Sequence, residues 1–251
     1  MDAFREGTAR EYAEILPGEA AGVPSGVGMV DAAALPMSAL TAWQGIFEKG
    51  LLTGEFSATS VPRVNGDGEV LGGELARGKR VLVLNAAGGV GIQAVQFARL
   101  AGAYVAGTTS QRNAAFVEGL GAEVVNYTVT TMKDWIRGED GRKFDLVFDC
   151  VGGEAMLGGW DAVKEGGVYV SVVPGFKEPG GGKPKGVRSE WFVMESRGEE
   201  LERIGKFYER GLVKGWVDSV WRVEQFKEAF ERTATGRARG KVVIRFAEED
   251  E

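Results

Sequence analysis

Short apolar runs alternate with helical repeats between residues 79 and 246. Residues 80–84 form a continuous run rich in valine and leucine, which is typical of a parallel strand buried on both faces. Apolar positions then recur at helical spacing through Ile92, Val95 and Leu100, and Gly102 stands where a helix C-cap is expected. Because residues 104–107 predict the next strand, the stretch predicts a β-α-β unit.

The alternation continues to the end of the chain. Amphipathic patterns predict helices over 30–50, 198–210 and 223–232. Apolar runs predict further strands at 124–125, 144–150, 167–173, 191–194 and 241–246. Strands that alternate with helices form parallel sheets with helices on both faces. We therefore expect an α/β fold built on a doubly wound parallel sheet of the Rossmann type.

The turn between the first of these strands and its helix is rich in glycine. Glycine lets the backbone turn tightly and lets a diphosphate approach, while the helix N-terminus supplies free N–H groups and the positive end of a dipole. A glycine cluster between a strand and a helix predicts a dinucleotide-binding turn more strongly than a plain loop. The candidate cofactor contacts here are Ala87, Gly88, Gly89, Val90 and Gly91.

The end of the second strand distinguishes NAD from NADP. A carboxylate at this place would hydrogen-bond the ribose 2′-hydroxyl of NAD. The chain has the segment TTSQR at 108–112 instead, so no carboxylate repels a 2′-phosphate. Ser110 and Arg112 supply donors for such a phosphate. We predict NADP(H) as the cofactor, held in part by Thr109, Ser110 and Arg112; the alternative for Arg112 is a solvated helix residue.

A third group of candidate contacts follows the predicted strand 144–150. Cys150, Val151 and Gly152 lie at its carboxyl end, where ligands bind in open α/β sheets. We expect Cys150 to be a small packed residue beside the cofactor rather than a nucleophile, because free cysteine is usually buried and no basic residue neighbours it. Asp149 is expected to be structural.

Composition removes several classes of chemistry. The 251 residues contain no histidine and one cysteine, which excludes Ser-His-Asp triads, histidine proton relays and His- or Cys-based zinc sites. Thirty basic against 36 acidic residues give a formal charge of −6, which argues against nucleic acid as a partner. No apolar run approaches the roughly 20 residues of a membrane span, and no signal peptide is recognisable. We expect a cytoplasmic location.

Several motifs together resemble a known superfamily. They are AAGGVG at 86–91, AAALPMSALTAWQGIF at 32–47, FDLVFDCVGG at 144–153, GGVYVSVV at 166–173 and GRARGKVVI at 236–244. Over residues 7–246 the chain resembles the medium-chain dehydrogenase/reductase superfamily, in its zinc-independent, quinone-oxidoreductase-like branch.

The resemblance implies a division of the chain. Residues 1–50 would be a short remnant of a β-rich GroES-like catalytic domain with its linking helix. Residues 51–77 would be a glycine-rich loop, for which a lid over the site is the alternative. Residues 78–246 would be the Rossmann dinucleotide-binding domain, and residues 247–251 an acidic tail.

The resemblance also implies further contacts and a partner. Tyr127 matches a position near the adenosine phosphate, and the backbone at Val172 and Val173 would meet the nicotinamide carboxamide. Arg239 or Lys241 would reach back to the cofactor, with a solvated basic turn as the alternative. A strand over 191–194 would pair with its copy in a homodimer.

The helical region 30–50 has an apolar face that includes Trp43, and we expect this face to pack in the core. The resemblance implies that the helix flanks the cofactor cleft, so a substrate-lining role for Trp43 or Gln44 is the alternative. Tyr12 is a further candidate for lining the substrate pocket.

The implied activity is reduction of an activated alkene, a quinone or a carbonyl by NADPH, with a small-molecule substrate and no zinc. The catalytic residues and the proton donor stay unassigned. Two other hypotheses remain open. A nucleotide-binding module or biosynthetic accessory protein would bind NADPH without turnover. A degenerate fragment would unfold without cooperativity.

Overall fold

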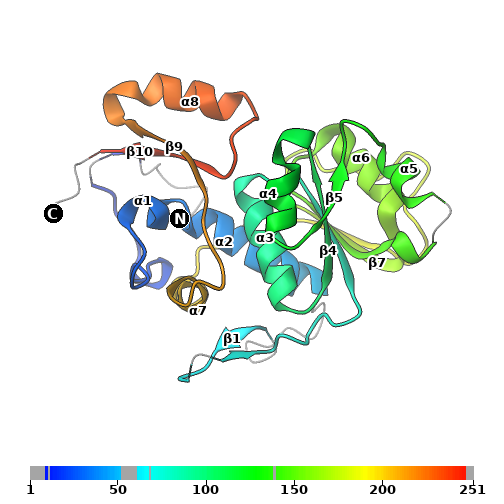
Figure 1. Cartoon of the computed structure of the whole chain (residues 1–251), viewed down its shortest axis with the longest axis horizontal. Coiled ribbons are helices and arrows are strands. Elements are labelled where there is room, and N and C mark those ends of the chain that lie inside the picture. The colour runs from blue at the N-terminus through cyan, green and yellow to red at the C-terminus, as the bar shows by residue number, and fades with distance from the viewer. Residues whose placement is uncertain (1–8, 11, 52–60, 68, 138–139, 247–251) are drawn as a thin grey trace.

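The computed structural model describes residues 9–10, 12–51, 61–67, 69–137 and 140–246. Two of the three sheets in this part of the chain organise the fold, and the third is a small hairpin. Figure 1 shows them as separate parts of the molecule. The larger sheet has six parallel strands in the order β5-β4-β3-β6-β7-β8. These are β3 (Arg80–Leu84), β4 (Tyr104–Thr109), β5 (Glu123–Asn126), β6 (Phe144–Asp149), β7 (Val163–Ser171) and β8 (Arg188–Trp191).

The strand order reverses beside β3. This strand pairs with β4 on one side, Val81 opposite Val105, and with β6 on the other, Val81 opposite Leu146. The chain therefore leaves β3 in one direction and later returns to its other edge. In open α/β sheets, the crevice at the carboxyl ends of such strands is where ligands bind.

Both faces of the sheet are covered, as the sequence predicted. Val81 and Val83 face one core, and Leu82 and Leu84 face the other. The helices of the first face are α2 (Pro36–Trp43), η2 (Gln44–Leu51), α3 (Gly89–Leu100), α4 (Ala114–Gly119) and α7 (Gly198–Glu209). Those of the second face are α5 (Met132–Ile136) and α6 (Gly153–Ala162). The doubly wound fold is confirmed.

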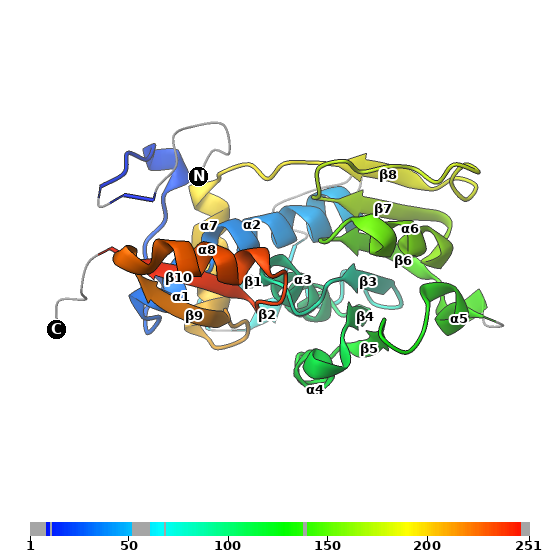
Figure 2. The ribbon, with the colours of Figure 1, turned by 90° about the horizontal axis from the view of Figure 1, so that it is seen from above.

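A second, two-stranded sheet lies beside the first. It consists of β9 (Val217–Arg222) and β10 (Lys241–Arg245), which run parallel, with α8 (Phe226–Ala234) joining them through η5 (Val223–Gln225). Helix α1 (Met29–Ala33) contacts both strands, and Figure 2 shows α8 lying along them. Our expectation that the strand at 241–246 continues the main sheet is wrong, because within the described residues β10 pairs with β9 and with no strand of the six-stranded sheet.

The glycine-rich stretch before β3 contains a small hairpin where we expected only a loop. Strands β1 (Arg63–Val64) and β2 (Val70–Leu71) pair antiparallel, and the Asn65 N–H donates to the Glu69 carbonyl oxygen. Residues 52–60 and 68 of the stretch lie outside the described residues. The remaining short helices are η1 (Pro17–Glu19), η3 (Gln111–Asn113) and η4 (Asp140–Arg142).

The structure agrees with the core packing that we expect for the helix of Trp43 and Gln44, and not with the alternative of a substrate-lining role. Trp43 is fully buried, with its ring edge-on to Phe47 at 4.6 Å and to Phe97 at 5.3 Å. Gln44 is 2% exposed and donates to the Glu195 carbonyl oxygen and to the Glu200 carboxylate, both at 2.9 Å. Both side chains therefore hold α2 and η2 in the core. Tyr12 is 86% exposed, so its role stays a prediction.

Next to Gln44 lies a cluster of carboxylates around Arg197. The guanidinium contacts Glu48 at 2.5 Å, Glu195 at 2.6 Å and Glu200 at 2.8 Å. Burial, followed by interaction with the Glu200 carboxyl, raises the pKa of Glu48 to about 7, although Arg197 pulls that pKa down. Between about pH 4.5 and pH 7, Glu48 therefore binds a proton more strongly in the folded state than in the unfolded state.

We expect this pKa to make stability fall as pH rises from about 4.5 to about 7, since the folded state binds more protons across that window. Glu48→Gln mimics the protonated form and should gain on the order of 1–2 kcal/mol at pH 8 while flattening the profile. Urea unfolding from pH 5 to pH 8 measures both, with Glu199→Gln on the exposed turn of α7 as control. A Glu48→Gln variant that is less stable than wild type at pH 8 contradicts the assignment.

Candidate cofactor site

The carboxyl ends of the parallel strands bring the predicted contacts to one edge of the sheet. Asn85 follows β3, Ser110 follows β4, Cys150 follows β6 and Val172 follows β7. These four strands are neighbours in one parallel sheet. Segments far apart in sequence therefore meet at the edge where α/β sheets bind ligands.

The glycine turn is held to β4 by its first two residues. Asn85 has a φ of 64°, a left-handed conformation that asparagine tolerates better than most residues. Its N–H donates to the Thr108 hydroxyl at 2.9 Å, and the Ala86 N–H donates to the Thr108 carbonyl oxygen at 3.0 Å. Gly88 is the N-cap of α3. The turn is therefore fixed before any ligand arrives.

Gly91 brings α3 close to the end of β3. A Cβ at this position would lie 2.9 Å from the Ala86 Cα and nearer still to the Asn85 carbonyl oxygen. Only glycine allows this approach. The first turn of the helix, with its free N–H groups, is consequently held at the carboxyl edge, where it suits an anion.

A cavity of about 340 Å³ at this edge contains five of the predicted contacts. Its lining consists of Asn85, Ala87, Thr109, Ser110, Arg112, Asn113, Tyr127, Gly236, Arg237 and Ala238. The glycine turn, the end of β4 and the segment that precedes β10 therefore form one site. None of the ten residues is acidic.

Arg237 is a site residue that we did not predict as a contact. Arg112 Nη2 donates to its carbonyl oxygen at 2.6 Å, and both side chains line the cavity. The basic run at 237–241 indicates that this segment could bind an anion, and from it we predict Arg239 and Lys241 as cofactor contacts. Only the fold shows that the turn after α8 reaches the end of β4.

Arg239 lies in the neighbouring cavity of about 260 Å³, which also contains Arg112 and Arg237. Its Nε donates to the Asn113 side chain at 2.9 Å, and its guanidinium lies 4.8 Å from the centre of the Phe116 ring. Arg239 is thus oriented by protein groups. Its contact with a cofactor remains a prediction.

Lys241 reaches the glycine turn directly. Its Cδ lies 2.5 Å from the place where a Cβ of Gly89 would be. The preceding residue, Gly240, donates its N–H to the Ala87 carbonyl oxygen at 3.1 Å and forms a parallel bridge with Gly88. Burial lowers the pKa of the Lys241 ammonium. The return strand β10 therefore places a desolvated cation beside the start of α3.

A buried carboxylate orders the edge beyond β6. Asp149 is fully buried and accepts hydrogen bonds from the Val151 N–H at 3.0 Å, the Gly152 N–H at 2.8 Å and the Ser171 hydroxyl at 2.8 Å. Ser171 in turn accepts from the Val173 N–H at 3.2 Å. One side chain thus links the loop after β6 to the end of β7, which agrees with a structural role.

Cys150 lies within that loop. Burial, with a smaller effect from the Asp149 charge, raises the pKa of its thiol well above the usual value. The thiolate is the reactive form of cysteine. The raised pKa disfavours the thiolate, and the half-buried Cys150 packs against the core. Its place beside a cofactor stays a prediction.

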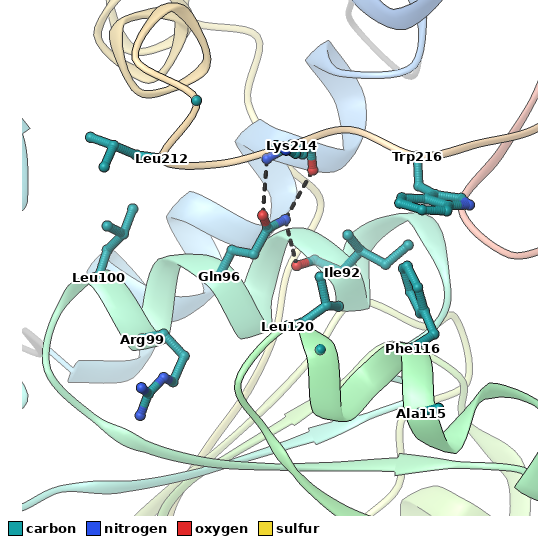
Figure 3. A pocket seen from close by; sticks show the side chains of 12 residues that line it. Ile92, Gln96, Arg99, Leu100, Ala115, Phe116, Leu120, Leu212, Lys214 and Trp216 are labelled. Carbon is teal, nitrogen blue, oxygen red and sulfur yellow. Dashed lines mark hydrogen bonds between the residues drawn. The ribbon is translucent and has the colours of Figure 1, made fainter.

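Another cavity, of about 630 Å³, lies away from this edge, between α3 and α4 (Figure 3). The segment that leads to β9 forms one wall of this cavity. Two hydrogen bonds hold this segment to α3, since the Gln96 side chain accepts from the Lys214 N–H at 2.9 Å and donates to the Lys214 carbonyl oxygen at 2.9 Å. Phe116 and Trp216 pack edge to face at 4.6 Å. It contains none of the predicted contacts.

Comparison with known proteins agrees with this geometry. A family model described as "Zinc-binding dehydrogenase" matches residues 120–244. The chain is 39% identical over 246 residues to a protein of Arthroderma benhamiae named "Probable zinc-binding oxidoreductase, mitochondrial", a match that covers 96% of this chain and 70% of that protein. The relative's mitochondrial name leaves our cytoplasmic location a prediction.

Two solved structures are similar at 28% identity. An NAD-dependent alcohol dehydrogenase superposes with a TM-score of 0.78, covering 97% of this chain and 66% of the other. The quinone oxidoreductase from Coxiella burnetii superposes with a TM-score of 0.70, covering 90% and 63%. The chain thus spans about two thirds of the length of these three proteins.

The residues present do not fit the zinc of the relatives' names. The chain has no histidine and one cysteine, and among the described residues no group of three His, Cys, Asp or Glu side chains is placed to hold a metal.

None of the described helices combines the length and apolar character that a membrane crossing requires.

The fold, the glycine turn at its carboxyl edge and the similarity over nearly the whole chain lead to one assignment: the chain belongs to the medium-chain dehydrogenase/reductase superfamily, in its quinone-oxidoreductase-like branch.

Proposed function

We propose that the protein is an NADPH-dependent oxidoreductase that reduces an activated alkene, a quinone or a carbonyl compound without zinc. The observation that carries the proposal is the cavity between the glycine turn, the end of β4 and the turn after α8. The names of the relatives support an oxidoreductase. They do not decide between NAD and NADP, since one similar structure is NAD-dependent by its title.

The preference for NADPH is argued from charge. Arg112 and Arg237 line the cavity, and its ten lining residues include no carboxylate. A 2′-phosphate carries negative charge and three acceptor oxygens, which guanidinium groups bind in charge-assisted hydrogen bonds. NADH lacks this phosphate. The arginines therefore contribute binding energy to NADPH that NADH does not receive.

The proposed cofactor contacts divide the dinucleotide between them. The start of α3 with Gly88, Gly89, Val90 and Lys241 would bind the diphosphate. The loop at Cys150, Val151 and Gly152 and the backbone at Val172 and Val173 would flank the nicotinamide. When bound, the cofactor supplies the hydride, while the protein supplies orientation and electrostatics. The Asp149 network keeps this part of the edge in place.

Arg112→Ala is expected to weaken NADPH binding about ten- to fiftyfold and NADH binding less than about threefold, because only NADPH loses a charge-assisted partner. Isothermal titration with each nucleotide measures the two losses. Arg99→Ala, an exposed arginine of α3 outside this cavity, serves as the matched control and should change neither. Equal losses for the two nucleotides on Arg112→Ala would overturn the assignment.

An NADPH consumption assay on the wild-type protein distinguishes an enzyme from a nucleotide-binding module. Mixed with NADPH and a panel of enones, quinones and aldehydes, the enzyme is expected to consume NADPH in the presence of at least one of them. Saturable NADPH binding without consumption across the panel would assign the protein as a nucleotide-binding module.

A homodimer through β8 belongs to the same proposal. This strand is at the edge of the sheet, but it covers Arg188–Trp191 rather than the expected 191–194. Trp191 at its end and Val193 beyond it are 45% and 38% exposed. An unpaired edge with exposed apolar side chains favours pairing with a second copy. Sedimentation equilibrium is expected to give the dimer mass, and Val193→Lys should shift the protein toward monomer.

A further inference from the structure

The hydroxyl of Ser38 is buried without a hydrogen-bond partner in the described structure. Ser38 lies in the first turn of α2 and is 1% exposed. A buried hydroxyl that forms no hydrogen bond costs folding free energy, and such groups are rare in folded proteins. The residues around this hydroxyl indicate which ligand could accept its hydrogen bond.

Three separate segments meet at Ser38. The Cβ position of Gly89 lies 3.1 Å from Ser38 Oγ, 2.5 Å from Lys241 Cδ and 3.3 Å from the Gly240 carbonyl oxygen. Gly89 is the first residue of α3. Helix α2, the N-terminus of α3 and the start of β10 therefore converge on one point beside the glycine turn.

The charges at this point are unbalanced. Lys241 is desolvated, which lowers the pKa of its ammonium, and its side chain forms no ion pair within the part of the chain that the structure describes. It also lies at the positive end of the α3 dipole, which disfavours a second positive charge. An anion bound between Ser38, Lys241 and α3 would relieve both costs.

Trp43 provides a comparison on the same helix. Its indole N–H is likewise buried without a partner, but it lies among the aromatic rings of Phe47 and Phe97. In the described structure the Trp43 ring lies against aromatic side chains, whereas Ser38 lies beside a lysine and the N-terminus of α3. The case for Ser38 thus rests on the convergence of the hydroxyl, the lysine and the helix N-terminus.

We propose that Ser38 donates a hydrogen bond to the diphosphate of the bound dinucleotide, with Lys241 as the counter-charge. The proposal rests on the proposed function and extends it. Because the diphosphate would contact α2, α3 and β10 together, cofactor binding would stabilise the packing of α2 and of the β9-β10 sheet against the glycine turn.

Ser38→Ala separates the two effects of the hydroxyl. Removing an unpaired buried hydroxyl is expected to leave the nucleotide-free protein as stable as wild type, or to raise its melting temperature by about 1–3 °C. Affinity for NADPH and for inorganic diphosphate should fall about three- to tenfold. A residue with a purely structural role would lower stability and would not weaken diphosphate binding selectively.

Thr233→Val is the matched control, since the Thr233 hydroxyl is bonded within α8 to the Ala229 carbonyl oxygen at 3.1 Å. It should leave both affinities unchanged. Unchanged diphosphate and NADPH affinity in Ser38→Ala would overturn the inference while wild-type NADPH binding still supported the proposed function. Diphosphate binding that depends on Ser38, in a protein that binds no dinucleotide, would retain the anion site and reject the proposed function.

Discussion

Gly91→Ala is expected to abolish nucleotide binding and to lower the free energy of unfolding by about 3 kcal/mol. A Cβ at this position would lie 2.9 Å from the Ala86 Cα and closer to the Asn85 carbonyl oxygen. Both are backbone atoms of the turn, so no side chain can move aside, and overpacking of this kind costs about 1–3 kcal/mol or more. To relieve the clash, α3 must shift away from β3, which displaces its N–H groups from the anion.

Urea unfolding and NADPH titration of the purified variant measure the two effects. Gly119→Ala is the control: this glycine ends α4, and a Cβ there meets no atom within 4 Å. Alanine should be neutral or slightly stabilising at that helical position. Normal NADPH affinity in Gly91→Ala would mean that the start of α3 does not form the site.

Asp149→Ala is expected to cost about 3–5 kcal/mol of folding free energy. The carboxylate accepts hydrogen bonds from the Val151 and Gly152 N–H groups and from the Ser171 hydroxyl. Alanine would leave the Gly152 N–H and the Ser171 hydroxyl buried without an acceptor and would also remove the partly buried bond from the Val151 N–H. Each buried donor that loses its acceptor costs about 1–3 kcal/mol. The loop after β6 and the end of β7 would then lose their connection.

Asp149→Asn tests whether hydrogen bonding is the cause. The amide oxygen still accepts from the two N–H groups, and the Ser171 hydroxyl can turn to accept from the amide nitrogen. We expect this variant to lose less than half of what Asp149→Ala loses in chemical unfolding. Equal losses would indicate that the negative charge itself, rather than the hydrogen bonds, stabilises the edge.

Local patterns were sufficient to predict the main sheet. Strand β3 is buried on both faces, and this burial can be predicted from its consecutive apolar residues alone. The glycine turn is equally local, since the strand before it and the helix after it have their own periodicities. The end of β4 follows from the same unit, which is why the sequence places Ser110 and Arg112 at this edge. Their contact with a cofactor stays a prediction.

Contacts between segments that are far apart in the sequence could not be predicted from local patterns. The pattern of residues 241–245 predicts a strand, but only the packing of α8 and α1 decides that β10 pairs with β9. Arg237 reaches the cavity because the turn after α8 bends back over β4. Ser38 belongs to a helical pattern that reveals no free hydroxyl. In each case the missing information is which distant segment lies alongside.

Trp43 illustrates the opposite difficulty. An aromatic residue on a linking helix suits both a substrate pocket and a core, and its spacing with Phe47 fits either. The structure places it in an aromatic cluster with Phe97. Burial depends on what covers the helix, and residues far along the chain supply that cover.

The most direct test of the account is an equilibrium titration of the wild-type protein with NADPH and with NADH. The account predicts saturable binding of one NADPH per chain, at least about tenfold tighter than NADH, because Arg112 and Arg237 bind the 2′-phosphate. A cooperatively folded protein that binds neither nucleotide would contradict the assignment of the carboxyl edge as a cofactor site. Tighter binding of NADH would retain the site and reverse its preference.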